Sequence, residues 1–422
     1  MTPREQGSRG AGEQGLHVSP LPPRPSAPLR SSLVVAQAGG PTAVINASLA
    51  GVVEAAQASG RFARIWGLVH GLEGALRGEM VDLTDLTSAQ LDRLAQTPAA
   101  ALGGSRYKLT PQDDSRIIDT LRQVGAAVFI GIGGNGTMTA CDRLARALAG
   151  EVAVVGVPKT VDNDLAGTDH CPGYGSAARA VAQLTRDTAL DLRAMRRFDR
   201  VVILEAMGRD AGWLAAAAAL ARTPGLAAPH LVYVPERPLV VPDFLAAVEQ
   251  GLAAQGWVYV AVSEGVRTPD GTLVSLLRGD LPRDALDRPI LSLGLGPAQY
   301  LAEQVGQALG VQTRTVRLST VQRASSAHVS SMDRAEAWTL GRAAVARALA
   351  GESDIMVGLR RAPGPYAVDI VPVALAEVAG HARPLPDAFL AADRPDVTPT
   401  FIEWLTPLLG DPLPDIERLP ID

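Results

Sequence analysis

Short runs of hydrophobic residues alternate with longer segments of helical spacing through most of the chain. Segments such as 138–149 and 176–195 place apolar or small residues three and four positions apart, which predicts helices. Strands that alternate with helices along a chain usually form a mainly parallel sheet flanked by helices. The pattern therefore predicts an α/β fold, with strands at 32–36, 126–132, 152–157, 200–207 and 257–262.

The first residues lack this pattern. Residues 1–31 are rich in Gly, Pro, Ser, Arg and Gln and have almost no large apolar side chain, so we expect a disordered tail. They also lack the apolar segment of a secretory signal. The rest of the 422-residue chain is long enough for two packed domains.

Composition narrows the possible partners. Hydrophobic residues make up 47% of the chain but aromatic residues only 4%, so the cores must be aliphatic. The net charge of −5 argues against nucleic acid as a partner. The alanine-rich run 213–221 is too short to cross a membrane and predicts a buried helix, so no membrane partner is expected. Cys141 and Cys171 provide neither a disulfide framework nor metal-ligand spacing, which predicts a reducing, cytoplasmic location.

The stretch 152–179 carries the densest group of reactive side chains. A β-branched run ends at Pro158, and within a few residues follow Lys159, Thr160, Asp162 and Asp164. A cation, a hydroxyl and two carboxylates suit phosphoryl transfer, which needs a base, positive charge and oxygen ligands for Mg2+. The alternative is a solvated surface turn rich in Asp and Asn. The apolar strand before it favours a site at the carboxyl end of a buried strand.

Glycine-rich turns follow other predicted strands. Gly39 and Gly40 come after the first strand, and GGNGT (133–137) follows the strand at 126–132. Such turns allow backbone N–H groups to approach a phosphate at a helix N-terminus. Neither turn is a Walker loop or a complete dinucleotide-binding fingerprint, so a tight packing turn remains the alternative for each.

Charged residues also stand at the ends of later strands. Arg209 follows the strand after Arg200, Glu264 follows the strand at 257–262, and Arg314 and Arg323 lie in TRTVRLSTVQR. Each alone is typical of a solvated strand end. Together they indicate one cleft for an anionic ligand.

These loops, in this order, resemble those of the phosphofructokinase family from about Leu33 to Asp422. LGGSR, GGNGT, PKTVDND, TDHCPGYGSAAR, EAMGRDAGW, SEG and VQRASSAHVSSMD match its landmarks one after another. The resemblance implies two domains with mainly parallel sheets flanked by helices, the active site in the cleft between them, and phosphoryl transfer to O1 of fructose 6-phosphate. It places a phosphoryl-donor domain at 32–175 plus 324–385 and a sugar-phosphate domain at 176–323 plus 386–422.

The resemblance also implies roles for individual residues. Asp162 matches the general base, with Thr160 beside it, and Asp164 and Asn135 match the Mg2+ side of the site. The expected donor-binding residues are Gly39, Gly40, Arg106, Gly134, Asn135, Gly136, Thr137 and Lys159. The expected sugar-phosphate residues are Met207, Gly208, Arg209, Glu264 and Arg323, with Arg209 also acting on the phosphoryl group in flight. Arg200 and Arg314 match arginines that reach the sugar phosphate from a neighbouring subunit, so a homodimer or homotetramer is implied.

The phosphoryl donor is open to two interpretations. Lys159 stands where pyrophosphate-dependent relatives have lysine and ATP-dependent relatives have glycine, and an ammonium there can bind the terminal phosphate of pyrophosphate. Gly136 is the residue that ATP users carry, and Asn135 departs from the usual aspartate near the metal. We favour pyrophosphate, with ATP as the alternative. The function itself has three competing interpretations, namely a kinase that also accepts sedoheptulose 7-phosphate, a non-catalytic regulatory paralogue, and a nicotinamide or diacylglycerol-type kinase.

Overall fold

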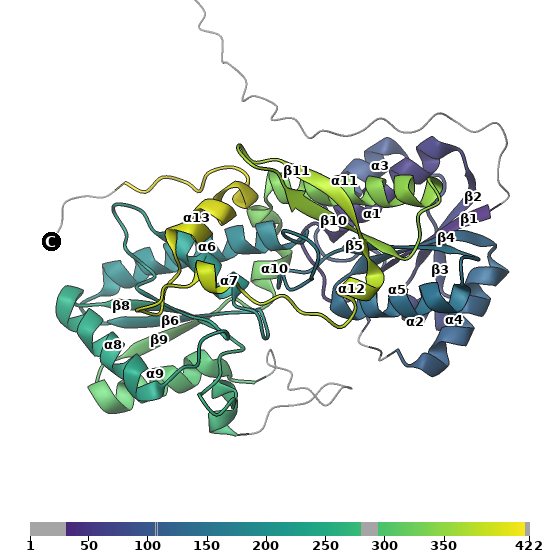
Figure 1. Cartoon of the computed structure of the whole chain (residues 1–422). Coiled ribbons are helices and arrows are strands. Elements are labelled where there is room, and N and C mark those ends of the chain that lie inside the picture. Colours follow the sequence, from purple (N-terminus) through teal and green to yellow (C-terminus); the bar gives the residue numbers. More distant parts are fainter. Residues whose placement is uncertain (1–30, 106, 108, 280–293, 418–422) are drawn as a thin grey trace, which may run out of the picture.

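Two separate β-sheets organise the chain, and helices flank both of them (Figure 1). The structure is a computed structural model that describes residues 31–105, 107, 109–279 and 294–417. The predicted tail therefore lies outside the described residues, apart from Ser31, which begins the first strand one residue earlier than expected. No helix in the described ranges is long and apolar enough to cross a bilayer.

The first sheet has seven strands in the order β11-β10-β5-β4-β1-β2-β3. Neighbouring strands are parallel except for the edge pairs β2–β3 and β10–β11, which are antiparallel. The strands are β1 (Ser31–Gln37), β2 (Phe62–Leu68), β3 (Met80–Asp82), β4 (Ala126–Gly133), β5 (Ala153–Pro158), β10 (Ile355–Arg361) and β11 (Val368–Ala374). The helices around them are α1 (Ile45–Ser59), α2 (Leu72–Arg77), α3 (Ser88–Gln96), α4 (Pro111–Gln123), α5 (Asn135–Leu148), α11 (Ser331–Leu349) and α12 (Leu375–Val378).

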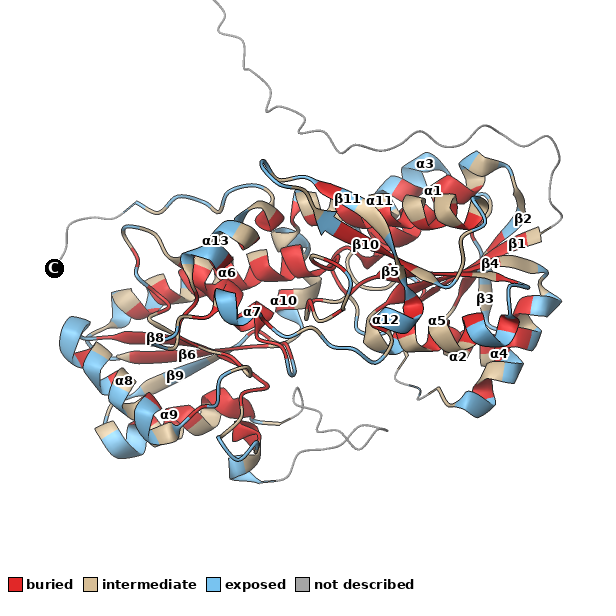
Figure 2. Cartoon of the chain, viewed as in Figure 1, coloured by how far each residue is buried: buried red, intermediate tan, exposed pale blue. Residues whose placement is uncertain are grey.

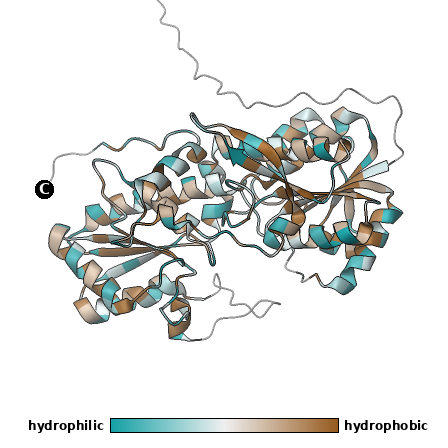
Figure 3. Ribbon diagram, in the orientation of Figure 1, coloured by the Kyte–Doolittle hydropathy of each residue, from teal (hydrophilic) through white to brown (hydrophobic). Residues whose placement is uncertain are grey.

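Alternation along β1 explains why helices cover both faces of this sheet. Leu33 and Val35 pack with α1, α3 and α11 on one face, whereas Val34 and Ala36 pack with α2, α4 and α5 on the other. Successive side chains of a strand point to opposite faces, so a strand that is apolar at every position must be covered twice. Figures 2 and 3 show the result, with buried, hydrophobic strands inside a layer of helices that are exposed on their outer sides.

The second sheet has four parallel strands in the order β7-β8-β6-β9. They are β6 (Val201–Ala206), β7 (Leu231–Tyr233), β8 (Val258–Ser263) and β9 (Thr313–Arg317). One face packs on α8 (Val241–Gln255) and α9 (Gly296–Leu309), and the other on α6 (Tyr174–Met195), α7 (Trp213–Ala217) and α13 (Pro399–Leu405). The second sheet and its helices are accompanied by short helices at Ala218–Ala221, Val274–Arg278, α10 (Val321–Ala324), Ser326–His328, Asp387–Phe389 and Thr406–Leu409.

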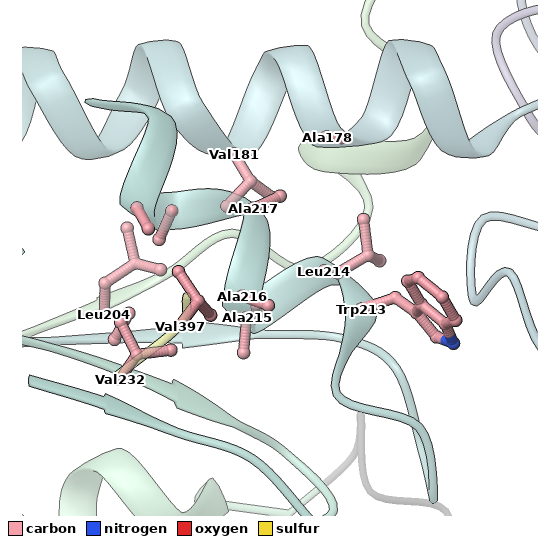
Figure 4. Packing of buried hydrophobic residues seen from close by; sticks show 14 of the residues in the cluster. Ala178, Val181, Leu204, Trp213, Leu214, Ala215, Ala216, Ala217, Val232 and Val397 are labelled. Atoms are coloured by element: carbon pink, nitrogen blue, oxygen red, sulfur yellow. The ribbon is translucent and has the colours of Figure 1, made fainter. Parts of the chain in front are cut away.

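The main sequence predictions of structure are confirmed. Each predicted strand is present, and β4 and β5 are adjacent and parallel, with Val128 opposite Ala153. The run 213–221 forms α7 and a 3-10 helix that are buried between α6 and β6 (Figure 4). Its alanines allow this close approach because they bring little volume. We retain the predicted domain boundaries, 32–175 with 324–385 and 176–323 with 386–422, as a proposal.

Two glycines determine how closely α1 and α11 cross. A Cβ atom on Gly51 would lie 2.1 Å from the backbone oxygen of Trp338, and one on Gly341 would lie 2.1 Å from the backbone oxygen of Ser48. The obstacle is backbone in both cases, so rotation of a side chain cannot relieve the clash. The small residues let α11, which is distant in sequence, close the same core as α1.

We therefore expect Gly51→Ala to lower the free energy of unfolding by about 1–3 kcal/mol, the usual cost of overpacking a core. Urea unfolding followed by circular dichroism measures it. Gly306→Ala is the matched control, because Gly306 lies exposed in α9 with its nearest obstacle at 4.0 Å. That variant should gain up to ~1 kcal/mol from helix propensity. Equal stability changes in the two variants would contradict the proposed crossing.

Candidate active site

Three neighbouring strands of the first sheet end in the predicted glycine and lysine turns. β5, β4 and β1 are adjacent and parallel, so their carboxyl ends lie at one edge. Gly39 and Gly40 follow β1, Gly134 follows β4, and Lys159 follows β5. The backbone N–H of Lys159 donates to the carbonyl of Gly133 at 3.0 Å, which joins two of these turns. The topology thus brings together residues that are 120 positions apart in sequence.

Lys159 is buried beneath the first glycine turn. Its side chain is only 1% exposed, and Nζ donates to the carbonyl oxygen of Gly40 at 2.5 Å. A Cβ on Gly39 would lie 3.3 Å from this Nζ, and one on Gly40 would lie 3.5 Å from Nη1 of Arg323. Two cations therefore border the turn. Burial lowers the pKa of Lys159 to about 8, so the ammonium form still dominates at pH 7.

Several charged side chains act on the carboxylate of Asp162. Burial and the charge of Asp164 raise its pKa to about 7, against the opposing effects of Arg209 and Lys159. The backbone N–H of Asp162 donates to Oγ1 of Thr160 at 3.1 Å, which fixes the turn before it. A carboxyl group that titrates near neutral pH is well matched to general-base work.

Asp164 and Asn135 lie side by side at the start of α5. Nδ2 of Asn135 donates to Oδ2 of Asp164 at 2.8 Å, while burial raises the pKa of that carboxyl. Oδ1 of Asn135 is buried without a hydrogen-bond partner among the described residues. An orphaned amide oxygen beside a carboxylate fits Mg2+, which prefers oxygen ligands.

Mg2+ would need further ligands from outside the protein. Across the described ranges, no group of three or more His, Cys, Asp or Glu side chains could hold a metal ion. Mg2+ commonly uses one or two carboxylates and completes its shell with water and substrate phosphates. Asp164 and Asn135 therefore fit a metal that arrives with a phosphorylated substrate.

Two further predicted donor-binding residues, Gly136 and Thr137, lie in the first turn of α5. Gly136 is exposed, and a Cβ there would meet no atom within 4 Å. Thr137 packs against Gly133, where a Cβ would lie 2.0 Å from its Oγ1. The first N–H groups of a helix lack partners within the helix, so this turn suits an anion. Arg106, also predicted to contact the donor, lies outside the described residues.

Loops from the second sheet lie next to Asp162. Met207, Gly208 and Arg209 follow β6, and Glu264 follows β8. Oε1 of Glu264 accepts from the N–H groups of Gly208 and Arg209, both at 3.3 Å. Arg209 adopts φ = 51°, the left-handed region that is unusual outside glycine. The charges of Arg209 and Glu264 both act on Asp162, so the two sheets contribute to one site.

Arg200 and Arg314 are not part of this group within one chain. Arg200 precedes β6 and donates to the carbonyl of Gly256 at 3.0 Å, and Arg314 pairs with Asp199. They lie at the amino end of β6, whereas Arg209 follows its carboxyl end, and six strand residues at ~3.3 Å each separate the two ends by about 20 Å. Contact with a neighbouring subunit's substrate stays a prediction for both. Arg323 borders the Gly39–Gly40 turn, and its contact with a sugar phosphate also stays a prediction.

A buried network behind the site was missed by the sequence analysis. Nδ1 of His170 is 2.8 Å from Asp169, and Nε2 is 2.7 Å from Glu336 of α11. Arg361 of β10 also pairs with Asp169, at 3.1 Å. Burial opposes a charge on His170, but Glu336 and the hydrogen bonds to both carboxylates outweigh it and raise its pKa to about 9. His170 therefore joins the 159–173 loop to α11.

Two further residues hold the same loop from a distance. Asp333 of α11 accepts from the N–H groups of Gly173 and Ser176, each at 2.8 Å, and so caps the start of α6. Arg383 donates to carbonyls of the loop from the far end of the chain. Their contacts span 150 residues or more, and no local pattern could have indicated them.

The family model described as Phosphofructokinase matches residues 32–348, which is more than half of the chain. The chain belongs to the phosphofructokinase family. This match confirms the predicted family, and the solved structures below confirm the predicted α/β fold.

Relatives match over nearly the whole length. A pyrophosphate–fructose 6-phosphate 1-phosphotransferase of Xanthomonas campestris pv. campestris is 38% identical over 393 residues, 91% of this chain and 92% of that protein. A sulfofructose kinase of Alkalicoccus urumqiensis is 36% identical over 89% of this chain and 90% of that protein. The solved pyrophosphate-dependent phosphofructokinase of Nitrosospira multiformis has a TM-score of 0.82 and 33% identity, and the match covers 92% of this chain and 95% of that one.

In this phosphofructokinase family member, we expect His170→Gln to lower the free energy of unfolding by about 3–5 kcal/mol, because it leaves the buried Glu336 carboxylate without its cation. The folded pKa of His170 is raised, so its contribution is complete below about pH 6.5 and is lost as pH rises through about 9. Urea unfolding at pH 6 and at pH 9.5 should therefore show a large difference between wild type and variant at pH 6 and a small one at pH 9.5.

The control is His381→Gln, because His381 is exposed. This variant should stay within about 0.5 kcal/mol of wild type at both pH values. A His170→Gln effect of equal size at pH 6 and pH 9.5 would show that the imidazole is not charged in the folded protein.

Proposed function

We propose that this protein catalyses Mg2+-dependent phosphoryl transfer from pyrophosphate to O1 of fructose 6-phosphate, giving fructose 1,6-bisphosphate and phosphate. The observation that carries the proposal is the position of Asp162. Its carboxyl has a pKa of about 7, and the positive charges of Lys159 and Arg209 both act on it. A base close to two cations suits a hydroxyl that attacks a phosphoryl group.

Each residue of the site has a proposed role in the transfer. Asp162 accepts the proton from the sugar 1-hydroxyl, and Thr160 holds the turn that carries this carboxylate. Lys159 and Arg209 stabilise the negative charge on the phosphoryl group as it moves. Asp164 and Asn135 would hold Mg2+, which when bound neutralises charge on the donor phosphates. Met207, Gly208 and Glu264 are proposed to bind the sugar, and Arg323 its 6-phosphate.

Lys159 supports pyrophosphate rather than ATP as the donor. Its buried ammonium lies against the Gly39–Gly40 turn, where a point charge can hold a terminal phosphate. The side chain also fills space that the ribose end of ATP would need. Gly136 is compatible with pyrophosphate as the donor. The space around it is open, so a larger residue would also fit there and the glycine is not required by packing. Relatives named for pyrophosphate at 38% identity add further support.

One other acceptor sugar, sulfofructose, is supported by the name of a relative. The relative from Alkalicoccus urumqiensis, at 36% identity, is named a sulfofructose kinase, so related sites act on a sugar with another anionic group at this end. We favour fructose 6-phosphate because of the relative with higher identity. Sedoheptulose 7-phosphate would be bound by the same residues.

We also propose a homodimer or homotetramer. Arg200 and Arg314 lie together at the amino end of β6 and β9, away from Arg209 of their own chain. Phe198, two residues before Arg200, is 72% exposed and is therefore available to such an interface. The cytoplasmic location predicted from the cysteines stays part of the proposal.

The direct test measures kcat/KM for pyrophosphate and for ATP with fructose 6-phosphate and Mg2+, in wild type and in Lys159→Gly. We expect a strong preference for pyrophosphate. Loss of a charge-assisted hydrogen bond should lower kcat/KM for pyrophosphate in the variant by about 10–100-fold. A wild type that prefers ATP would overturn the proposed donor.

Asp162→Asn is the control for the chemical step. It should lower kcat by ~10²–10⁴-fold, as expected for loss of a general base, and leave the KM for fructose 6-phosphate nearly unchanged. Near-normal kcat in this variant would mean that another group is the base. Wild type that is inactive with both donors would favour a non-catalytic paralogue.

A further inference from the structure

The segment 382–385 lies along the 159–173 loop, although more than 200 residues separate them. Ala382 forms an isolated antiparallel bridge with Leu165, and the N–H of Arg383 donates to the carbonyl of Asp164 at 2.8 Å. The segment follows α12 and belongs to the stretch that returns from the first sheet to the second (Figure 1). The 159–173 loop thus gains a short strand-like partner from the C-terminal part of the chain.

The guanidinium of Arg383 donates to three further backbone carbonyls of this loop. Nη1 donates to the carbonyls of Thr168 and Asp169, both at 2.7 Å, and Nη2 donates to the carbonyl of Asn163 at 3.1 Å. With the backbone contact, one arginine binds carbonyls on both sides of Asp164. A guanidinium suits this task because its planar fork has five N–H donors, whereas a lysine ammonium is a single point.

The loop needs such support because its backbone is unusual at the centre. Asn163, directly between the two carboxylates, adopts φ = 55° and uses Oδ1 to accept from the N–H of Cys171 at 2.9 Å. A left-handed residue outside glycine persists only when its surroundings hold it. The contact of Arg383 with the carbonyl of Asn163 holds this residue, and with it the directions of Asp162 and Asp164.

The same segment is tied to the loop that carries Arg209. The Arg383 guanidinium lies 4.6 Å from the ring centroid of Trp213, and Nε1 of Trp213 donates to the carbonyl of Arg383 at 3.3 Å. Oε1 of Glu236 accepts from the N–H of Leu385 at 2.8 Å and from that of Gly212 at 2.9 Å. Gly212 and Trp213 follow Arg209 by only a few residues. Segment 382–385 therefore contacts both loops that supply groups to the site.

We propose that Arg383 is a positioning residue that holds the base Asp162 and the phosphoryl-binding Arg209 at their working separation. This inference rests on the proposed function of Asp162 and Arg209. Arg383 itself contacts the carbonyls of one loop and the indole of the other, and no role in binding substrate is assigned to it. A misplacement of ~1 Å between reacting groups can lower a rate by ~10²-fold while substrates still bind.

The test compares Arg383→Ala and Arg383→Lys with wild type, using the full chain. We expect Arg383→Ala to lower kcat by ~10²-fold and to change the KM for fructose 6-phosphate by less than about threefold. Millimolar guanidinium ion should restore part of kcat in this variant, because Arg383 is half-buried and leaves a space that the ion can enter. Urea at the same concentration should not. Arg383→Lys should keep the charge but lose about tenfold in kcat, because it cannot reach three carbonyls at once.

Arg360→Ala is the matched control, since Arg360 is exposed on β10 and belongs to neither loop. It should have wild-type kinetics. Calorimetric titration with pyrophosphate gives the fraction of sites that bind in each variant, so that kcat is expressed per competent site. Should Arg383→Ala fail to fold, Arg383→Lys decides by the same criteria.

The proposal is overturned if either folded variant keeps kcat within threefold of wild type, or if kcat falls only in proportion to the competent sites. It is also overturned if KM rises in step with the loss of kcat and guanidinium restores nothing. Failure of the proposed function is a separate result, because it appears as a wild type that is inactive with fructose 6-phosphate.

Discussion

The burial of the Lys159 ammonium beneath the Gly40 carbonyl is the constraint around which the site is arranged. A buried cation is costly unless opposite charge and hydrogen bonds compensate for it. Asp162 and Asp164 supply that charge, and the Gly40 oxygen accepts at 2.5 Å. The parallel order β5-β4-β1 makes the arrangement possible, because it places the carboxyl ends of β5 and β1 on either side of β4, and the long Lys159 side chain reaches the Gly40 turn.

The same charges set the pKa of Asp162, the proposed base. Asp162 titrates near pH 7 because burial and Asp164 raise its pKa while Arg209 and Lys159 hold it down. Arg209 comes from the second sheet, so the balance depends on how the two halves of the chain are joined. Segment 382–385 connects the two halves through Trp213 and Glu236, and Asp333 connects them through the N–H of Ser176. In the positioning role proposed for Arg383, contacts outside the reacting groups hold the direction of the Asp162 carboxylate.

Local patterns were sufficient for much of this arrangement. The apolar runs predicted the strands, and the glycine and lysine turns marked strand ends that meet at one edge of the sheet, because both signals lie within a few residues. The pairing of His170 with Glu336 and of Arg383 with Asn163 could not be predicted, since the partners are 166 and 220 residues apart. Lys159 and Gly136 favoured different donors, and the residues next to them in sequence could not indicate that Gly136 is open and Lys159 is enclosed in the structure.

The measurement that tests the role of Lys159 most directly is calorimetric binding of pyrophosphate, with Mg2+, to wild type and to Lys159→Met at pH 7 and pH 9. Burial lowers the pKa of Lys159 to about 8, so the cation is lost between these pH values. The affinity of wild type should fall by about tenfold more than that of the variant, and this comparison removes the titration of the ligand itself. The same pH dependence in both proteins would contradict a phosphate-binding ammonium at this position.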